Sequence, residues 1–220
     1  YPDFDGKPIA ESDVHQDERF DLLYRLRMRY ADRRDVYVAG NMYVYYEEGD
    51  PSATFAPDVM VVFGVPPTRR RVYKLWEEKH VPAVVFEVSS RATWLDDRGN
   101  KRQLCEDLGV SEYFLYDPLC EYLKPPLQGS RLEGGVYRAI EPGADGCLVS
   151  EQLDLRLCLE DGLLAIIDAR TGERLLRVME TEILARRAAA GAGDRDQRAV
   201  ELENAHLRAE NERLRREQGT

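Results

Sequence analysis

Two short apolar runs constrain this chain most, because each carries a carboxylate where a buried strand would carry none. Residues 57–64 read PDVMVVFG, with Asp58 near the start, and residues 81–90 read VPAVVFEVSS, with Glu87 near the end. Nearly continuous apolar runs of this length are typical of strands inside a sheet that is covered on both faces. The runs therefore predict two core strands of an α/β fold.

The two carboxylates need a physical reason to lie on these strands. An ionised carboxylate is costly to bury without a partner. Two convergent carboxylates can share a divalent cation, and oxygen ligands suit Mg²⁺. The alternative is that Asp58 and Glu87 each lie just beyond a strand and are solvated. Because the two acids lie at the ends of adjacent predicted strands, the pattern favours a metal site, with Mg²⁺ as cofactor and Mn²⁺ as its substitute.

The segment after the second strand adds a lysine to these acids. Residues 94–108 predict a single helix that ends at Gly109, a typical C-terminal cap. Asp97 and Lys101 share one stripe of this helix with Leu104 and Leu108, which must face the sheet. A charge in this place can act on a metal-bound water or a phosphate. The alternative is an ordinary helical ion pair, worth about 0.3–0.5 kcal/mol.

The remaining patterns complete a sheet with flanking helices. Residues 15–30 have helical spacing, residues 35–48 predict a strand or a hairpin, and residues 112–118 predict a third core strand. Residues 66–80 predict a basic loop or a short helix. Three later segments, LEGGVYRAIEP, LDLRLCLEDG and LLAIIDARTGE, predict a β meander.

Charge and cysteine content narrow the class of protein. The formal net charge is −10, which argues against an extensive DNA-coating surface but not against a small site where metal ions supply positive charge. No apolar run approaches the length of a membrane span. Scattered cysteines predict reduced thiols in a cytoplasmic protein. They are Cys105, Cys120, Cys147 and Cys158.

From about Glu180 the composition becomes rich in Ala, Glu, Arg and Leu, which predicts a first domain over residues 1–179 and a helical tail over 180–220. Apolar residues recur every seven positions, at Val200, Leu207 and Leu214, and two asparagines lie between them. With Asn204 and Asn211 at the a positions, this pattern favours a parallel homodimeric coiled coil. A solvated single helix is the alternative.

Four motifs in order resemble the Uma-type putative restriction endonucleases, a branch of the PD-(D/E)XK nuclease superfamily. The motifs are PDV, FEVSS, DDRGNK and LGVSEYFLYDP, and the resemblance spans residues 12–177. The superfamily pattern places a lysine two residues after the glutamate, where this chain has Ser89. In this family the following helix supplies the lysine, and Lys101 matches that position. His15 also matches a family position.

The resemblance implies a restriction-endonuclease-like mixed central sheet flanked by helices, and metal-dependent hydrolysis of DNA. Asp58, Glu87 and the carbonyl of Val88 would hold Mg²⁺, and Lys101 would be the catalytic lysine. Asp97 would be an extra ligand or a partner of Lys101.

A basic segment and a second functional class remain open. Arg69, Arg70 and Arg71 either contact the DNA backbone or form a solvated basic loop. The alternative function is a catalytically weak nuclease fold that binds DNA or assembles through its coiled coil. The acidic charge favours this alternative, whereas the complete Asp–Glu–Lys set favours the enzyme.

Overall fold

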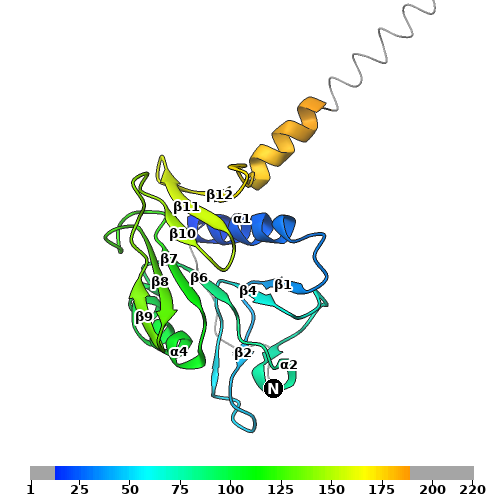
Figure 1. The fold of residues 1–220 in the computed structure, drawn as a ribbon, viewed down its shortest axis with the longest axis vertical. Coiled ribbons are helices and arrows are strands. Elements are labelled where there is room, and N and C mark those ends of the chain that lie inside the picture. The colour runs from blue at the N-terminus through cyan, green and yellow to red at the C-terminus, as the bar shows by residue number, and fades with distance from the viewer. Residues whose placement is uncertain (1–12, 189–220) are drawn as a thin grey trace, which may run out of the picture. The chain divides into compact units, whose positions relative to one another are not determined.

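A six-stranded mixed sheet is the centre of the computed structural model, which describes residues 13–188 (Figure 1). Its strand order is β1-β4-β6-β7-β8-β9, with β6 and β7 parallel and every other neighbouring pair antiparallel. The bounds are β1 Val36–Ala39, β4 Val59–Phe63, β6 Val84–Val88, β7 Glu112–Tyr116, β8 Leu127–Glu133 and β9 Val136–Ala139. The predicted mixed α/β class is therefore confirmed.

Helices pack on both faces of this sheet. Helix α1 (Asp13–Arg29) buries Leu22 and Leu26 in a cluster that contains Phe86 of β6. Helix α4 (Asn100–Leu108) buries Cys105 in the cluster on the other face, which contains Val85. Because both faces are covered, the central strands β4, β6 and β7 are almost continuously apolar and buried, as their sequences predict.

The predicted β meander is confirmed only in its second part. Strands β10 (Leu148–Ser150), β11 (Leu155–Glu160) and β12 (Leu163–Asp168) form a three-stranded antiparallel sheet. Leu155, Leu164 and Ile166 pack in the same cluster as α1. The segment LEGGVYRAIEP instead contributes to β8 and β9, which extend the central sheet beyond β7.

Residues 35–48, for which the sequence predicts a strand or a hairpin, form two strands in different sheets, and the second of these strands belongs to a small third sheet. This sheet contains β2 (Val44–Tyr45), β3 (Thr54–Phe55) and β5 (Tyr73–Lys74), and the short helix α2 (Leu75–Glu78) follows β5. Strand β1 pairs with β4, whereas β2 pairs with β3 and β5. The two apolar stretches therefore belong to different sheets, because each finds its partner elsewhere in the chain.

The single helix predicted over residues 94–108 is broken in the structure. It forms α3 (Trp94–Arg98) and α4, and Gly99 separates them with φ −102° and ψ −98°, outside the helical region. Helix α4 ends at Gly109, whose φ of 84° is the left-handed conformation that glycine adopts at a helix cap. The predicted end of the helix is thus confirmed, and its continuity is not.

The cysteine prediction is wrong for one pair. Cys147 and Cys158 form a disulfide with Cα atoms 4.4 Å apart. The physical reason is strand register: Leu148 of β10 lies opposite Leu157 of β11, so the residues just outside this pair also face each other. Cys105 and Cys120 are free thiols.

The C-terminal part forms a separate unit, with the boundary after Leu175. Residues 178–188 are helical. The predicted coiled coil from about Asp196 onward lies outside the described residues. Among residues 13–188, no helix combines the length and the apolar character that a membrane crossing requires.

Candidate active site

Asp58 and Glu87 come from neighbouring antiparallel strands. Asp58 directly precedes β4, Glu87 lies in β6, and the register opposes Val59 to Phe86. The next position in this register brings Asp58 to Glu87. The backbone N–H of Val88 donates to Asp58 Oδ2 at 2.8 Å, and the backbone N–H of Asp58 lies 3.4 Å from Glu87 Oε2. These reciprocal contacts hold the two carboxylates beside each other.

Lys101 reaches the carboxylates from the helical side. Its Nζ atom lies 3.0 Å from Glu87 Oε2 and 3.0 Å from Asp97 Oδ1. Glu87 and Asp97 are both fully buried. The structure therefore brings together the four side chains that the sequence places at the site, which are those of Asp58, Glu87, Asp97 and Lys101, although the helix that carries the last two is broken between them.

The fully buried Asp97 has partners besides Lys101. The hydroxyl of Ser89 lies 3.4 Å from Asp97 Oδ2, and the hydroxyl of Tyr113 donates to the backbone carbonyl of Asp97 at 2.8 Å. The Lys101 ammonium completes its surroundings. The Ser89 hydroxyl and the Lys101 ammonium therefore meet at the same aspartate.

His15 and Gly40 shape the Asp58 side. His15 is buried in α1, and its Nε2 atom lies 3.5 Å from Asp58 Oδ2. Gly40 follows β1, and a Cβ atom added there would lie 2.6 Å from the carbonyl oxygen of Asp58. Only glycine permits this close approach of the two backbone segments.

Burial and charge act in opposite directions on the two strand carboxylates. Complete burial raises the pKa of Glu87 well above its usual range; the charge of Lys101 opposes this rise, and Asp58 and Asp97 add to it. For Asp58, burial also raises the pKa. The hydrogen bond and charge of His15, the charge of Lys101 and the Val88 N–H outweigh burial and lower it. Neighbouring carboxylates thus differ in how readily they ionise.

Burial and neighbouring charges also act in opposite directions on the pKa values of Asp97 and Lys101. Burial lowers the pKa of Lys101, but the charges of Glu87, Asp97 and Asp58 outweigh it and raise the pKa above the ordinary lysine value. Burial raises the pKa of Asp97, against the charge and hydrogen bond of Lys101. Lys101 is therefore a permanent cation among three carboxylates at neutral pH.

The site offers oxygen atoms to a cation. Glu87 Oε1 is buried and has no hydrogen-bond partner among the described residues. An unpartnered buried carboxylate oxygen is costly unless a cation or a water satisfies it. Within residues 13–188, no group of three or more His, Cys, Asp or Glu side chains is arranged to hold a metal. Two carboxylates with a backbone carbonyl suit Mg²⁺, which keeps several of its waters when bound.

Arg70, one of the three arginines of the basic segment, supports the fold. Its guanidinium forms an ion pair with Glu78 at 2.6 Å and lies 4.3 Å from the centre of the Tyr37 ring. Arg69 and Arg71 are exposed, and Arg69 lines a cavity of about 400 Å³. A DNA contact from these arginines stays a prediction.

Sequence reasoning missed Ser89 and Tyr113 as partners of Asp97. Ser89 carries one usable signal, since strand alternation places it on the same face as Glu87. Tyr113 carries none, because its contact joins strand β7 to a helix sixteen residues earlier. Gly40 likewise has no sequence signal, as its neighbour is a backbone carbonyl from another strand.

The sequence profile of the Uma2 family, described as "Putative restriction endonuclease", matches residues 1–163. No curated protein matches the chain. Four solved chains match, including the crystal structure of "a putative nuclease belonging to DUF820 from Anabaena variabilis ATCC 29413". That match has a TM-score of 0.42 and 13% identity, and it covers 68% of this chain and 80% of the other. The family match spans most of the chain.

Proposed function

Because the chain belongs to the Uma2 family of putative restriction endonucleases, we propose that it is a metal-dependent endonuclease that hydrolyses phosphodiester bonds in DNA. One observation carries the proposal beyond the family: the fully buried Glu87 lies against Lys101 on one oxygen and has no partner on the other. A purely structural ion pair would satisfy both oxygens, since an unpartnered buried oxygen lowers stability.

Asp58, Glu87 and the Val88 carbonyl would hold Mg²⁺, or Mn²⁺ in its place. When bound, the ion would supply Lewis-acid stabilisation of the phosphoryl oxygens and would lower the pKa of a bound water below that of bulk water. The raised pKa of Glu87 suits this role, because a cation favours the ionised carboxylate that burial alone disfavours.

Lys101 acts as a fixed positive charge in this proposal. A lysine serves as a general base only when its pKa is lowered toward the working pH. Here the surrounding carboxylates raise the pKa of Lys101, so its ammonium stays protonated. Held between Glu87 and Asp97, the ammonium stabilises the negative charge that develops on the phosphate during hydrolysis. Asp97 orients Lys101, and Ser89 and Tyr113 orient Asp97.

His15 belongs to the same assembly through Asp58. Its ring nitrogen lies 3.5 Å from Asp58 Oδ2, the oxygen that also accepts the hydrogen bond from the Val88 N–H. In this proposal His15 positions the Asp58 carboxylate and helps keep it ionised, so that the acid with the lowered pKa is always available for the cation.

The test is cleavage of supercoiled plasmid DNA by the full chain. We expect nicking or cutting with Mg²⁺ or Mn²⁺ and none with EDTA. Glu87→Gln preserves the shape of the side chain and removes its charge, and we expect cleavage to fall by about 10²-fold or more. Glu133→Gln, on the exposed end of β8, is the matched control and should cleave normally. Cleavage that survives EDTA or Glu87→Gln would rule out the proposed mechanism.

A parallel homodimer through the C-terminal tail is the further part of this proposal. Its support is the seven-residue spacing of Leu207 and Leu214, with Asn204 and Asn211 each three residues before one of these leucines. Two nuclease sites in one particle would allow both strands of a duplex to be cut in one encounter.

A further inference from the structure

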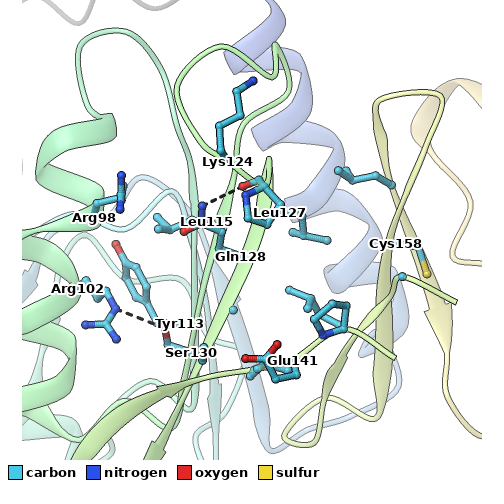
Figure 2. A pocket seen from close by; sticks show the side chains of 18 of the residues that line it. Arg98, Arg102, Tyr113, Leu115, Lys124, Leu127, Gln128, Ser130, Glu141 and Cys158 are labelled. Carbon is cyan, nitrogen blue, oxygen red and sulfur yellow. Dashed lines mark hydrogen bonds between the residues drawn. The ribbon is translucent and has the colours of Figure 1, made fainter. Parts of the chain in front are cut away.

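A pocket of about 700 Å³ borders the helix pair that carries the candidate site. Its walls come from α3 and α4 on one side and from β7, β8, β9, β10 and β11 on the others (Figure 2). Asp97 and Lys101 belong to the candidate site, where Lys101 also contacts Glu87. Arg98 follows Asp97 in the sequence and Arg102 follows Lys101, and both arginines line the pocket. The two regions therefore share one pair of helices.

Two basic side chains, Arg98 and Arg102, line the side of the pocket that α3 and α4 form, and Lys124 lines it farther from these helices (Figure 2), with its Nζ atom donating to the Cys120 carbonyl at 2.6 Å. Arg98 is exposed, Arg102 is half-buried, and Lys124 comes from the loop between β7 and β8 (Figure 2). Among residues 13–188, none of the three forms an ion pair with a carboxylate. Arg102 makes only long hydrogen bonds of 3.4 Å, to the Ser130 hydroxyl and the Tyr137 carbonyl. In a chain with net charge −10, such a group of basic residues suits an anion.

The pocket has a partly apolar and partly polar lining. On the side of α3 and α4 its apolar walls are Tyr113, Leu115 and Ala139, whereas Leu127, Ile140 and Leu148 line the other side. Polar atoms project among them. Gln128 uses its amide nitrogen on the Pro125 carbonyl at 2.9 Å, which leaves its amide oxygen as an acceptor. Ser130 and Glu141 add further acceptors. Apolar walls with a few placed polar groups are typical of small-molecule sites, and such acceptors pair with the amino groups of nucleobases.

We propose that this pocket binds one nucleotide of the DNA substrate, with the base against Tyr113, Leu115 and Ala139 and its phosphate on Arg98 and Arg102. The inference rests on the proposed function, because it takes DNA as the substrate. Phosphate contacts fix the position of the strand, and the base inside the pocket supplies a preference for what flanks the cleaved bond.

A direct contact links the pocket to the candidate site. Tyr113 lines the pocket, and its hydroxyl donates to the backbone carbonyl of Asp97 at 2.8 Å. The same aspartate holds Lys101. A strand anchored in the pocket is therefore held against the elements that position the catalytic lysine, which is how a binding contact can place a phosphate for cleavage.

The test measures binding of a fluorescent single-stranded oligonucleotide to the full chain in EDTA, where cleavage cannot interfere. Arg98→Ala combined with Arg102→Ala should weaken binding and lower the slope of log Kd against log salt by about 1 for each phosphate that the variant no longer binds. Arg138→Ala removes an exposed charge from β9, outside the pocket, and should change neither quantity. A double variant that behaves like this control overturns the phosphate assignment.

A second variant tests the base. Ala139 lines the pocket from β9, so Ala139→Trp fills it, and we expect binding to weaken about tenfold with an unchanged salt slope. Val136→Trp, at an exposed position of β9 outside the pocket, is the control. If thermal unfolding shows that Ala139→Trp does not fold, Gln128→Leu replaces it with the same expected loss. Unchanged affinity in the folded variant overturns the inference.

Two further experiments complete the test. One distinguishes a free nucleotide from a nucleotide within a strand, and the other distinguishes failure of this inference from failure of the proposed nuclease activity. Deoxynucleoside monophosphates should bind much more weakly than the oligonucleotide and compete with it; equal or tighter binding of the free nucleotide overturns the assignment to a strand. Oligonucleotide binding that depends on the pocket, without any cleavage in Mg²⁺, supports this inference and refutes the proposed nuclease activity. An oligonucleotide that does not bind at all overturns the inference itself.

Discussion

Two charged clusters on the same pair of helices differ in burial and in how their charges are compensated. Asp97 and Lys101 are buried or nearly so, and they form an ion pair at 3.0 Å. Arg98 and Arg102, the residues that follow them, line an open pocket, and neither forms a close ion pair among the described residues, although the charge of Arg102 acts on Glu106. Buried charges must satisfy one another, because water cannot. Charges at a pocket are satisfied by water and remain available to a ligand.

This difference separates what each cluster contributes. Removing a member of the buried cluster should disturb stability and chemistry together, since the remaining charges lose their compensation. Removing a basic residue of the pocket should affect substrate binding alone. The predictions below test this separation, beginning with the largest expected effect.

Lys101→Met should be the most damaging change. It leaves Glu87 and Asp97 buried without their cation, and breaking a buried ion pair in this way costs about 3–5 kcal/mol. Arg98→Met removes a neighbouring but exposed charge and should alter the unfolding free energy by less than about 0.5 kcal/mol. Urea denaturation of both variants measures the difference. Equal stability of the two variants would mean that the buried cluster is hydrated and that the two clusters do not differ.

The pH dependence of cleavage should report Glu87. Because burial raises the folded pKa of Glu87, the proton is taken up at a higher pH than for an ordinary carboxyl group, and cleavage should be lost as pH falls through that raised pKa. Mg²⁺ favours the ionised form, so increasing its concentration should shift the acid limb to lower pH. A pH–rate profile at two Mg²⁺ concentrations checks this. An acid limb that does not respond to Mg²⁺ would contradict a metal on Glu87.

The same raised pKa has a consequence for stability without metal. A carboxyl group whose folded pKa lies above its unfolded value stabilises the folded state at low pH, and this contribution is lost as pH rises through the folded pKa. In EDTA, the wild-type chain should therefore lose this contribution between the ordinary and the raised pKa of Glu87. Urea denaturation at a series of pH values measures the unfolding free energy of the wild-type chain and of Glu87→Gln. The difference between the two values should change across that pH window. A constant difference would show that Glu87 keeps an ordinary pKa.

Arg102→Ala should have a smaller effect, confined to binding. We expect the KM for DNA cleavage to rise several-fold with little change in kcat, because Arg102 lines the pocket and lies outside the carboxylate cluster. Lys101→Ala, in contrast, should lower kcat. Steady-state cleavage of a labelled oligonucleotide resolves the two parameters. A fall in kcat for Arg102→Ala would place it in the catalytic cluster.

Removal of the C-terminal tail should leave both clusters unchanged. A chain that ends at Arg177 should keep the metal dependence and the KM of the full chain, but sediment as a monomer where the full chain sediments as a dimer. Its products should shift from cutting of both strands toward nicking. Two monomers in sedimentation would refute the coiled coil, and two dimers would mean that another surface joins the subunits.

Local sequence patterns were sufficient to locate the central strands and the residues of the candidate site. The apolar runs around Asp58 and Glu87 are read directly from neighbouring residues, and so is the helical stripe that carries Lys101. Such periodicities are properties of a few consecutive residues, and burial of the resulting strands and helices follows from them. The order of the four motifs was also enough to indicate the family, which the profile match confirms.

The tertiary structure decided every feature whose partner is distant in the chain. Pairing of β1 with β4 decided that residues 35–48 form no hairpin of their own, and the β10–β11 register brought Cys147 to Cys158. The approach of His15 to Asp58 joins residues more than forty positions apart. Likewise the pocket beside α3 and α4 exists only because five strands meet the two helices there. These contacts depend on how elements pack, and packing selects partners by shape and charge across distances that no local pattern in the sequence records.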